Sequence, residues 1–188
     1  MTRRDRFDGE FDTVLAAARA GSGWAFERIF TALAPVVEGY LRLQGSAEPE
    51  DLTSEVFVAV LRNVTTFDGD EPGFRSWVFT IAHRRLLDER RRTMRRPPSA
   101  PLAEAPDAPA PDDVEQTVGR ALAVAQVRAL CQRLVPDQRD VLLLRLLGRL
   151  TVDEVAEALG KSPGAVKALQ RRGYAAITRL VEREGVPL

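Results

Sequence analysis

The sequence predicts an all-α protein made of two helical domains joined by a flexible linker. Apolar residues recur every three or four positions through most of the 188 residues, which is the period of an amphipathic helix, and no stretch alternates as a strand does. The pattern stops at residues 97–113, where PPSAPLAEAPDAPAPDD has six prolines and no basic residue. This composition is typical of an extended linker. We therefore expect domains at residues 1–96 and 114–188.

The start of the first domain has the composition of a small helical core. Residues 12–20, DTVLAAARA, favour a helix, and Ser22 can cap the next one after GSG. Two or three helices fit the stretch that ends near Gly45. Its large apolar residues lie three or four apart and predict a core-facing stripe: Trp24, Phe26, Ile29, Phe30, Leu33, Val36, Val37, Tyr40 and Leu41.

The next segment, PEDLTSEVFVAVLRNV, is an amphipathic helix with an acidic outer edge. Leu52, Val56 and Val60 share its apolar face. Asp51, Ser54 and Glu55 lie on another face. Taken alone, the acids are explained by the positive end of the helix dipole, which stabilises carboxylates in the first turn.

An aromatic and then basic helix follows the turn-rich loop TTFDGDEPGF. Its sequence, FRSWVFTIAHRRLLDERRRTMRR, starts with Phe74, Trp77 and Phe79 and ends with clustered arginines. Arginines can neutralise phosphates, and aromatic rings beside them can stack on unpaired bases. Core packing is an equally good explanation for any single one of these aromatic residues.

The clearest local motif is LTVDEVAEALGKSPGAVKALQRR at residues 150–172, which predicts a helix-turn-helix. Thr151 and Glu154 form a capping box, and Leu150 with Val155 forms a hydrophobic staple around it. Gly160 then suits the left-handed position that ends the first helix.

Ser162 and Pro163 start a second helix within three residues of the first. If Val166 and Leu169 pack inward, the outer face consists of small, amide and basic residues, which suits a DNA major groove: Ala165, Lys167, Ala168, Gln170, Arg171 and Arg172. An ordinary helical hairpin with solvated basic residues is the alternative that the motif alone leaves open.

The bulk composition excludes several classes of protein. The net charge is zero, but residues 61–96 carry 9 basic and 5 acidic groups whereas residues 1–60 carry 6 and 10, so the charges are segregated. One histidine and one cysteine, without suggestive carboxylate pairs, predict no catalytic residue, no metal site and no cofactor. We expect Cys131 to be a buried thiol. A charged N-terminus and the lack of a membrane-length apolar run predict a cytoplasmic protein with no membrane insertion.

Together these motifs, in this order over about residues 22–183, resemble an extracytoplasmic-function (ECF) sigma factor of bacterial RNA polymerase. The resemblance implies an initiation factor whose acidic helix contacts core polymerase through Asp51, Ser54 and Glu55. It implies that the aromatic and basic helix, with the loop before it, binds the -10 promoter element through Phe67, Asp68, Trp77, His83, Arg84, Arg85 and Arg91. The helix-turn-helix is implied to bind the -35 element through Lys161, Ser162, Ala165, Lys167, Ala168, Arg171 and Arg172. The family is usually held inactive by an anti-sigma factor, so we expect one here.

Two departures from the family pattern limit what the resemblance implies. Thr80 and Ile81 stand where primary sigma factors place a tryptophan pair, so we expect weaker promoter melting. GAVKALQRRGY differs from the commoner GTVKSRLHRAR, so the promoter sequence cannot be carried over. A free-standing helix-turn-helix transcriptional regulator and a purely protein-binding helical adaptor are the alternative functions.

Overall fold

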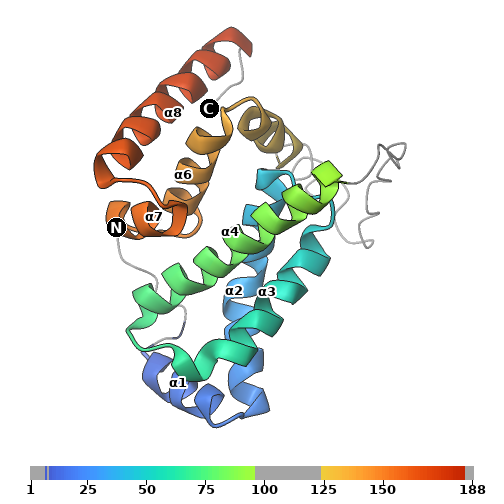
Figure 1. Cartoon of the computed structure of the whole chain (residues 1–188), viewed down its shortest axis with the longest axis vertical. Helices are drawn as coiled ribbons and strands as arrows, with labels where there is room; N and C mark the ends of the chain where they lie inside the picture. Colours follow the sequence, from blue (N-terminus) through green and yellow to red (C-terminus); the bar gives the residue numbers. More distant parts are fainter. Residues whose placement is uncertain (1–6, 8, 96–123, 185–188) are drawn as a thin grey trace, which may run out of the picture.

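The computed structural model describes residue 7 and residues 9–95 and 124–184, and every regular element in these ranges is a helix (Figure 1). The predicted all-α class is therefore confirmed. The linker expected at residues 97–113 lies outside the described residues, as do the proposed domain boundaries on either side of it. We call residues 7–95 the N-terminal module and residues 124–184 the C-terminal module.

The N-terminal module is a bundle of three long helices closed at one end by a short one. Helices α2 (Gly23–Gln44), α3 (Pro49–Asn63) and α4 (Glu71–Arg95) pack against one another. Helix α1 (Phe11–Arg19) contacts α2 and the short 3-10 helix η1 (Val64–Thr66), which links α3 to α4. This arrangement leaves an outer edge of α3 and the end of α4 open to partners.

Helix α2 is one continuous helix of 22 residues, although Pro35 lies inside it. It ends at Gly45, whose φ of 85° is the left-handed conformation that glycine adopts at little cost. The predicted core stripe is wrong at Trp24 and Phe30, whose exposed fractions are 53% and 46%. The stripe is wider than the buried face of the helix, and Phe30 packs at the surface against Phe57 of α3 with ring centroids 4.9 Å apart.

The core of this module is built by side chains that repeat every three or four residues on α4. Phe74, Val78, Phe79, Ala82 and Leu86 are all fully buried. They meet the inner face of α2, where the ring of Tyr40 lies edge-on to that of Phe79 at 5.5 Å. The apolar face of α4 packs into this core, and most of its arginines lie on the other faces of the helix.

The C-terminal module consists of a helix at residues 124–132 followed by α6 (Pro136–Leu146), α7 (Val152–Leu159) and α8 (Pro163–Glu184). Helix α8 packs on both α6 and α7. Its small core contains these fully or almost fully buried residues: Val141, Leu142, Leu144, Leu150, Val155, Val166 and Leu169.

The two modules touch each other. Helix α6 packs against α2, and α7 meets α4, so that the C-terminal module sits across one side of the N-terminal bundle (Figure 1). Buried side chains from both modules form one continuous apolar cluster. No helix in the described ranges has the length and apolar character that crossing a membrane requires.

Candidate protein and nucleic-acid interfaces

The predicted helix-turn-helix is confirmed in its local geometry. The amide of Glu154 donates to Thr151 Oγ1 at 3.2 Å, and the amide of Thr151 donates to the Glu154 carboxylate at 2.5 Å, which completes the capping box. Gly160 ends α7 with a φ of 60°. Ser162 Oγ then accepts from the amide of Ala165 at 3.2 Å. These caps fix the angle at which α8 leaves the turn.

The outer face of α8 carries exposed basic side chains. Lys167, Arg171 and Arg172 are exposed, whereas Val166 and Leu169 are buried against α6 and α7, as the sequence predicts. Small residues lie between these basic side chains: Ser162 is exposed, and Ala165 and Ala168 are partly exposed. Because these side chains are short, the backbone of α8 can approach a partner closely.

Lys161 differs from the other basic residues of this group because it is tied to the module itself. Its Nζ lies 2.8 Å from Asp137 Oδ2 at the start of α6, and its side chain is 28% exposed. The pair links the turn to α6. Lys161 therefore holds the turn in place in addition to lying beside the exposed face.

Asp51, Ser54 and Glu55 all lie on the exposed outer edge of α3, where the sequence places them. Glu55 Oε2 is 4.0 Å from Arg85 Nη1 of α4. Together with Val58, whose exposed fraction is 45%, these residues line a shallow depression between α3 and α4. The structure thus brings Arg85, assigned to the -10 group, beside the acidic edge assigned to polymerase.

The loop before α4 is organised around an aromatic cluster. The ring of Phe67 is 5.1 Å from Phe74 and 5.3 Å from Trp77, and Phe67 is almost fully buried. Its neighbour Asp68 is fully exposed and lies 3.6 Å from Arg19 of α1. Arg19 also donates to the carbonyl of Phe67. The sequence pattern did not predict that Arg19 reaches this loop.

His83 is the candidate residue whose placement differs most from the expectation. It is 3% exposed, and its Nδ1 lies 2.9 Å from the Tyr40 hydroxyl in the core. The cause is the helix period, because position 83 falls on the same inner face as Phe79, Ala82 and Leu86. In this arrangement the imidazole cannot touch DNA.

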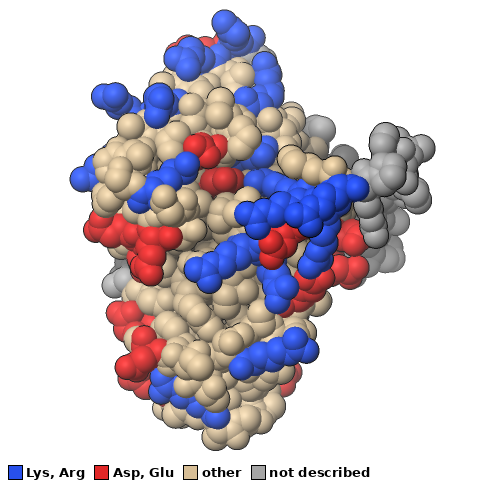
Figure 2. Space-filling view, in the orientation of Figure 1, with Lys and Arg blue, Asp and Glu red and all other residues tan. Residues whose placement is uncertain are grey.

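The remaining basic residues of α4 are accessible. Arg84 and Arg91 are exposed, and Arg85 is partly exposed. Figure 2 shows Lys and Arg gathered over the C-terminal half of α4 and again over α8, with tan and red surface between them. Arg91 is 14 residues beyond Trp77, about 21 Å along the helix axis. The -10 candidates therefore form two groups, one aromatic and one basic.

A polar cluster between the modules was missed by sequence reasoning. Arg139 and Asp140 of α6 are 8% and 7% exposed, and both face Gln44 and Arg90 of the N-terminal module. Burial lowers the pKa of Arg139. In the sequence its one visible sign is the charged pair Arg139 and Asp140, which directly precedes the apolar run VLLL.

Comparison with known proteins decides the family. Residues 29–96 match the model of sigma-70 region 2, and residues 125–177 match that of sigma-70 region 4. The chain is 37% identical over 149 residues to the ECF sigma factor ShbA of Streptomyces griseus, covering 76% of this chain and 77% of that one. The chain belongs to the ECF sigma factors. Region 2 contains α3 and α4 of this sigma factor, and region 4 contains α6 and α7 and most of α8.

Other relatives of this chain are also sigma factors. The ECF sigma factor BldN of Streptomyces coelicolor is 35% identical over 167 residues, which cover 87% of this chain but 63% of BldN. The sigma factor CarQ of Myxococcus xanthus is 32% identical over 169 residues, covering 87% of this chain and 92% of CarQ.

Solved structures show the same fold. CnrH, in complex with the cytosolic domain of CnrY, superposes with a TM-score of 0.67 at 24% identity, covering 91% of this chain and 96% of CnrH. RpoE of Bartonella quintana, in complex with the anti-sigma factor NepR, gives 0.61 at 17% identity, covering 84% and 96%.

Proposed function

We propose that this sigma factor binds core RNA polymerase and directs it to promoters with a -10 and a -35 element. The observation that carries the proposal is that one chain holds both region 2 and region 4, each with an exposed surface of the required chemistry. An acidic edge on α3 and a basic face on α8 are directed at different partners. The protein would do no covalent chemistry and would act through differences in binding energy.

The acidic edge of α3 is the proposed polymerase contact. Asp51, Ser54 and Glu55 are exposed and lie beside the exposed apolar side chain of Val58. Such an edge fits a basic partner surface with an apolar centre, because charge complementarity guides association while apolar burial holds the complex.

Helix α4 and the loop before it are the proposed -10 surface. Trp77 is partly exposed and packs on the ring of Phe67, and Asp68 beside Phe67 is exposed. Phe67 itself is almost fully buried, so it supports the exposed edge of Trp77 and does not face DNA as the sequence predicted. Arg84, Arg85 and Arg91 would hold the phosphates on the same side. Unpaired bases stack well on such edges, whereas the arginines add affinity that does not depend on sequence.

Helix α8 is the proposed -35 reader. Its start is capped by Ser162, and Lys167, Arg171 and Arg172 project from the face that is not packed on α6 or α7. A recognition helix needs this combination of a rigid turn and an open outer face. Ser162 and Lys161 lie at the N-terminal end of the same face.

The test is run-off transcription with purified core polymerase on the promoters that the holoenzyme retains from genomic DNA. We expect transcripts only when both the sigma factor and core polymerase are present. A free-standing regulator would bind its operator without polymerase, and a helical adaptor would bind neither DNA nor polymerase. Specific DNA binding without polymerase, and no run-off product with it, would replace the proposal with the regulator.

We also propose a cytoplasmic location and an anti-sigma partner, as is usual in this family. The location follows from the proposed work on cytoplasmic polymerase, and the anti-sigma partner follows from the family. Purification of the tagged sigma factor from its host under low salt tests the second, since an anti-sigma factor would co-purify in equimolar amount and inhibit run-off transcription when added back.

A further inference from the structure

Arg19, the last residue of α1, reaches the loop that precedes α4. Its Nη2 donates to the backbone carbonyl of Phe67, and the same nitrogen lies 3.6 Å from Asp68 Oδ1. The two acceptors belong to consecutive residues of the loop. Arg19 therefore fixes the peptide group that joins Phe67 to Asp68, and with it the direction in which the Asp68 side chain leaves the backbone.

Both ends of this loop are anchored on α4. At the near end the ring of Phe67 lies 5.1 Å from that of Phe74, and at the far end the carbonyl of Asp70 accepts from the amide of Phe74 at 2.8 Å. Asp68 and Gly69 lie between these anchors. Gly69 has a φ of 150°, which residues with a side chain rarely adopt. The contact from α1 thus falls at the start of the two-residue span that lies between the anchors.

Helix α1 is itself held firmly against the bundle. Val14 and Ala18 are buried, and the ring of Phe11 lies 5.6 Å from that of Phe74. The helix therefore gives the loop a fixed point of support. It also lies outside the residues that match sigma-70 region 2, which begin at residue 29.

The simplest explanation of Arg19 is that a basic residue in the last turn of α1 favours the helix dipole. That explanation accounts for the charge but not for the hydrogen bond to another element. The ion pair with Asp68 adds little stability, because the Arg19 side chain is 37% exposed and that of Asp68 is fully exposed. A guanidinium holds its donors in a rigid plane, so a contact with two acceptors sets geometry more than stability.

We propose that Arg19 is a positioning residue for the -10 element, which holds the loop so that Asp68 and the exposed edge of Trp77 meet the same unpaired base. The proposal deepens the proposed function and rests on it for the DNA step. A carboxylate only accepts hydrogen bonds, so Asp68 favours a base with an exocyclic amine over thymine, which has none. Because Arg19 orders the loop beforehand, binding does not have to order it.

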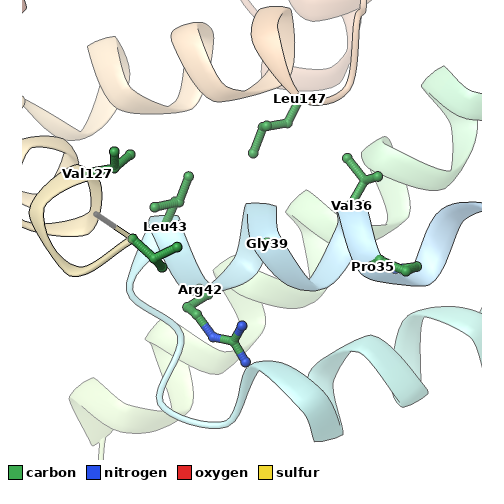
Figure 3. Close-up of a pocket in the computed structure, with 8 residues that line it drawn as sticks. Pro35, Val36, Gly39, Arg42, Leu43, Val127 and Leu147 are labelled. Atoms are coloured by element: carbon green, nitrogen blue, oxygen red, sulfur yellow. The ribbon is translucent and has the colours of Figure 1, made fainter. Parts of the chain in front are cut away.

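The contact made by Arg19 is remote from the place where the two modules meet. Figure 1 shows α1 at the end of the N-terminal bundle that is far from α6 and α8. The apolar groove between α2 and the C-terminal module is lined by Val36, Leu43, Val127 and Leu147 (Figure 3). Val36 lies 13 residues beyond the first residue of α2, about 20 Å along the helix axis. A change at Arg19 therefore tests the loop and leaves the arrangement of the modules intact.

The effect on the loop is measured in the free, full-length chain by hydrogen exchange followed by NMR. The probe is the amide of Phe67, which donates to the carbonyl of Val64 at 3.3 Å. Arg19→Met keeps the length of the side chain but removes its donors, and we expect it to raise the exchange rate at Phe67 about fivefold. Arg19→Lys keeps a donor and should restore most of the protection. The amide of Leu52 in α3 is the internal reference and should not change.

Helical content and melting temperature are recorded for each variant. If Arg19→Met loses helix, Arg19→Ala takes its place. An exchange rate at Phe67 that stays at the wild-type value when the donors of Arg19 are removed would overturn the proposal.

Base discrimination is measured with the holoenzyme on forked DNA from the promoters that the run-off test identifies. The non-template strand of the -10 element is left unpaired, and each position is tested with all four bases. We expect Arg19→Met to reduce the preference at one position about fivefold, and Arg19→Lys to keep it. Asp68→Ala should lose the same preference, and the double variant should lose no more, because both residues act through one contact. Arg183→Ala, which removes one exposed charge at the end of α8, is the control and should keep the preference.

A direct contact between Arg19 and a phosphate is the alternative that this experiment excludes. Such a contact would lower the affinity for all four bases equally and reduce the salt slope by about 1, whereas the proposal expects an unchanged slope. A reduced slope, or additive losses in the double variant, would overturn the proposal. If the wild-type holoenzyme retains no forked promoter DNA, the proposed function fails, while the exchange rate at Phe67 still decides whether Arg19 holds the loop.

Discussion

His83 and Tyr40 form a buried polar pair between α2 and α4. Burial raises the pKa of Tyr40 far above its ordinary value and lowers the pKa of His83 below 6.5. On His83 the charge of Asp140 acts in the opposite direction to burial, while Arg90 adds to the lowering. Both side chains are therefore neutral near pH 7, and their hydrogen bond joins two uncharged groups.

This pair predicts that the folded protein loses stability as the pH falls below about 6.5. In the unfolded chain His83 binds a proton near its ordinary pKa of 6.5, whereas the folded state resists it because its pKa is lower. The unfolded state then binds more protons, so the free energy of unfolding decreases with acidification. Urea unfolding at pH 7.5 and 5.5 measures the loss, which should be smaller in His83→Gln. An equal loss in both proteins would assign the pH dependence to other groups.

The positions of single residues could be predicted from the sequence where they depend on neighbours close in the chain. Thr151, Gly160 and Ser162 occupy their expected positions because capping depends on neighbours within four residues. His83 and Phe67 could not be placed in the same way. Their burial depends on which face of α4 meets α2 and on how the loop folds onto Trp77, and both are decided by contacts distant in the sequence.

Helix α8 combines a packed inner face with an outer face that we propose to bind the -35 element, so the two roles can be separated by mutation. Lys167, Arg171 and Arg172 are exposed, and replacing them with alanine removes no buried contact. We expect each variant to bind -35 DNA more weakly without unfolding. A base contact should change sequence preference by about 1 to 3 kcal/mol, whereas a phosphate contact should lower the salt slope by about 1.

Binding titrations at several salt concentrations distinguish the two kinds of contact on α8. Arg179→Ala is the control, because Arg179 is exposed on the same helix two turns beyond Arg172. It should leave the -35 affinity unchanged at a salt concentration where the other variants differ. Unchanged affinity in all three test variants would remove α8 as the reader.

The turn between α6 and α7 gives a second test at the level of an element. A Cβ on Gly148 would stand 2.6 Å from Leu150 Cδ1 and 2.7 Å from the backbone carbonyl of Leu144, so the turn would have to shift. Gly148→Ala should cost about 1 to 3 kcal/mol of stability, as overpacking does. Gly164→Ala on α8 meets open space and should gain up to about 1 kcal/mol. Thermal unfolding of the two variants, run side by side, should move in opposite directions.

At the scale of the whole molecule, the sequence predicts the modules but not how they meet. Each helix follows from its apolar period, and the order of motifs identifies the family. The contact between the modules depends instead on Gln44, Arg139 and Asp140, which are buried polar residues. In the sequence such a polar residue only interrupts the apolar period of its helix. Its role becomes clear when the structure shows its partner in the other module.

The exposed acidic edge of α3 offers the most direct test of assembly with polymerase. Asp51→Arg with Glu55→Arg places two positive charges where the proposed partner surface is basic, and like charges at an interface cost several kcal/mol. We expect core binding to collapse. The fold itself should lose only about 1 kcal/mol, because both sites are exposed. The cost comes from cations near the start of α3 and from loss of the exposed Glu55–Arg85 ion pair.

The matched control is Asp153→Arg with Glu157→Arg, which reverses two exposed acids at the same spacing of four on α7. It changes the net charge by the same amount but leaves α3 untouched, so it should still bind core polymerase. Both proteins should melt near the wild-type temperature. If the α3 variant assembled and initiated as well as the α7 variant, overall charge and not this helix would govern the interaction, and the polymerase contact would have to lie elsewhere on the N-terminal module.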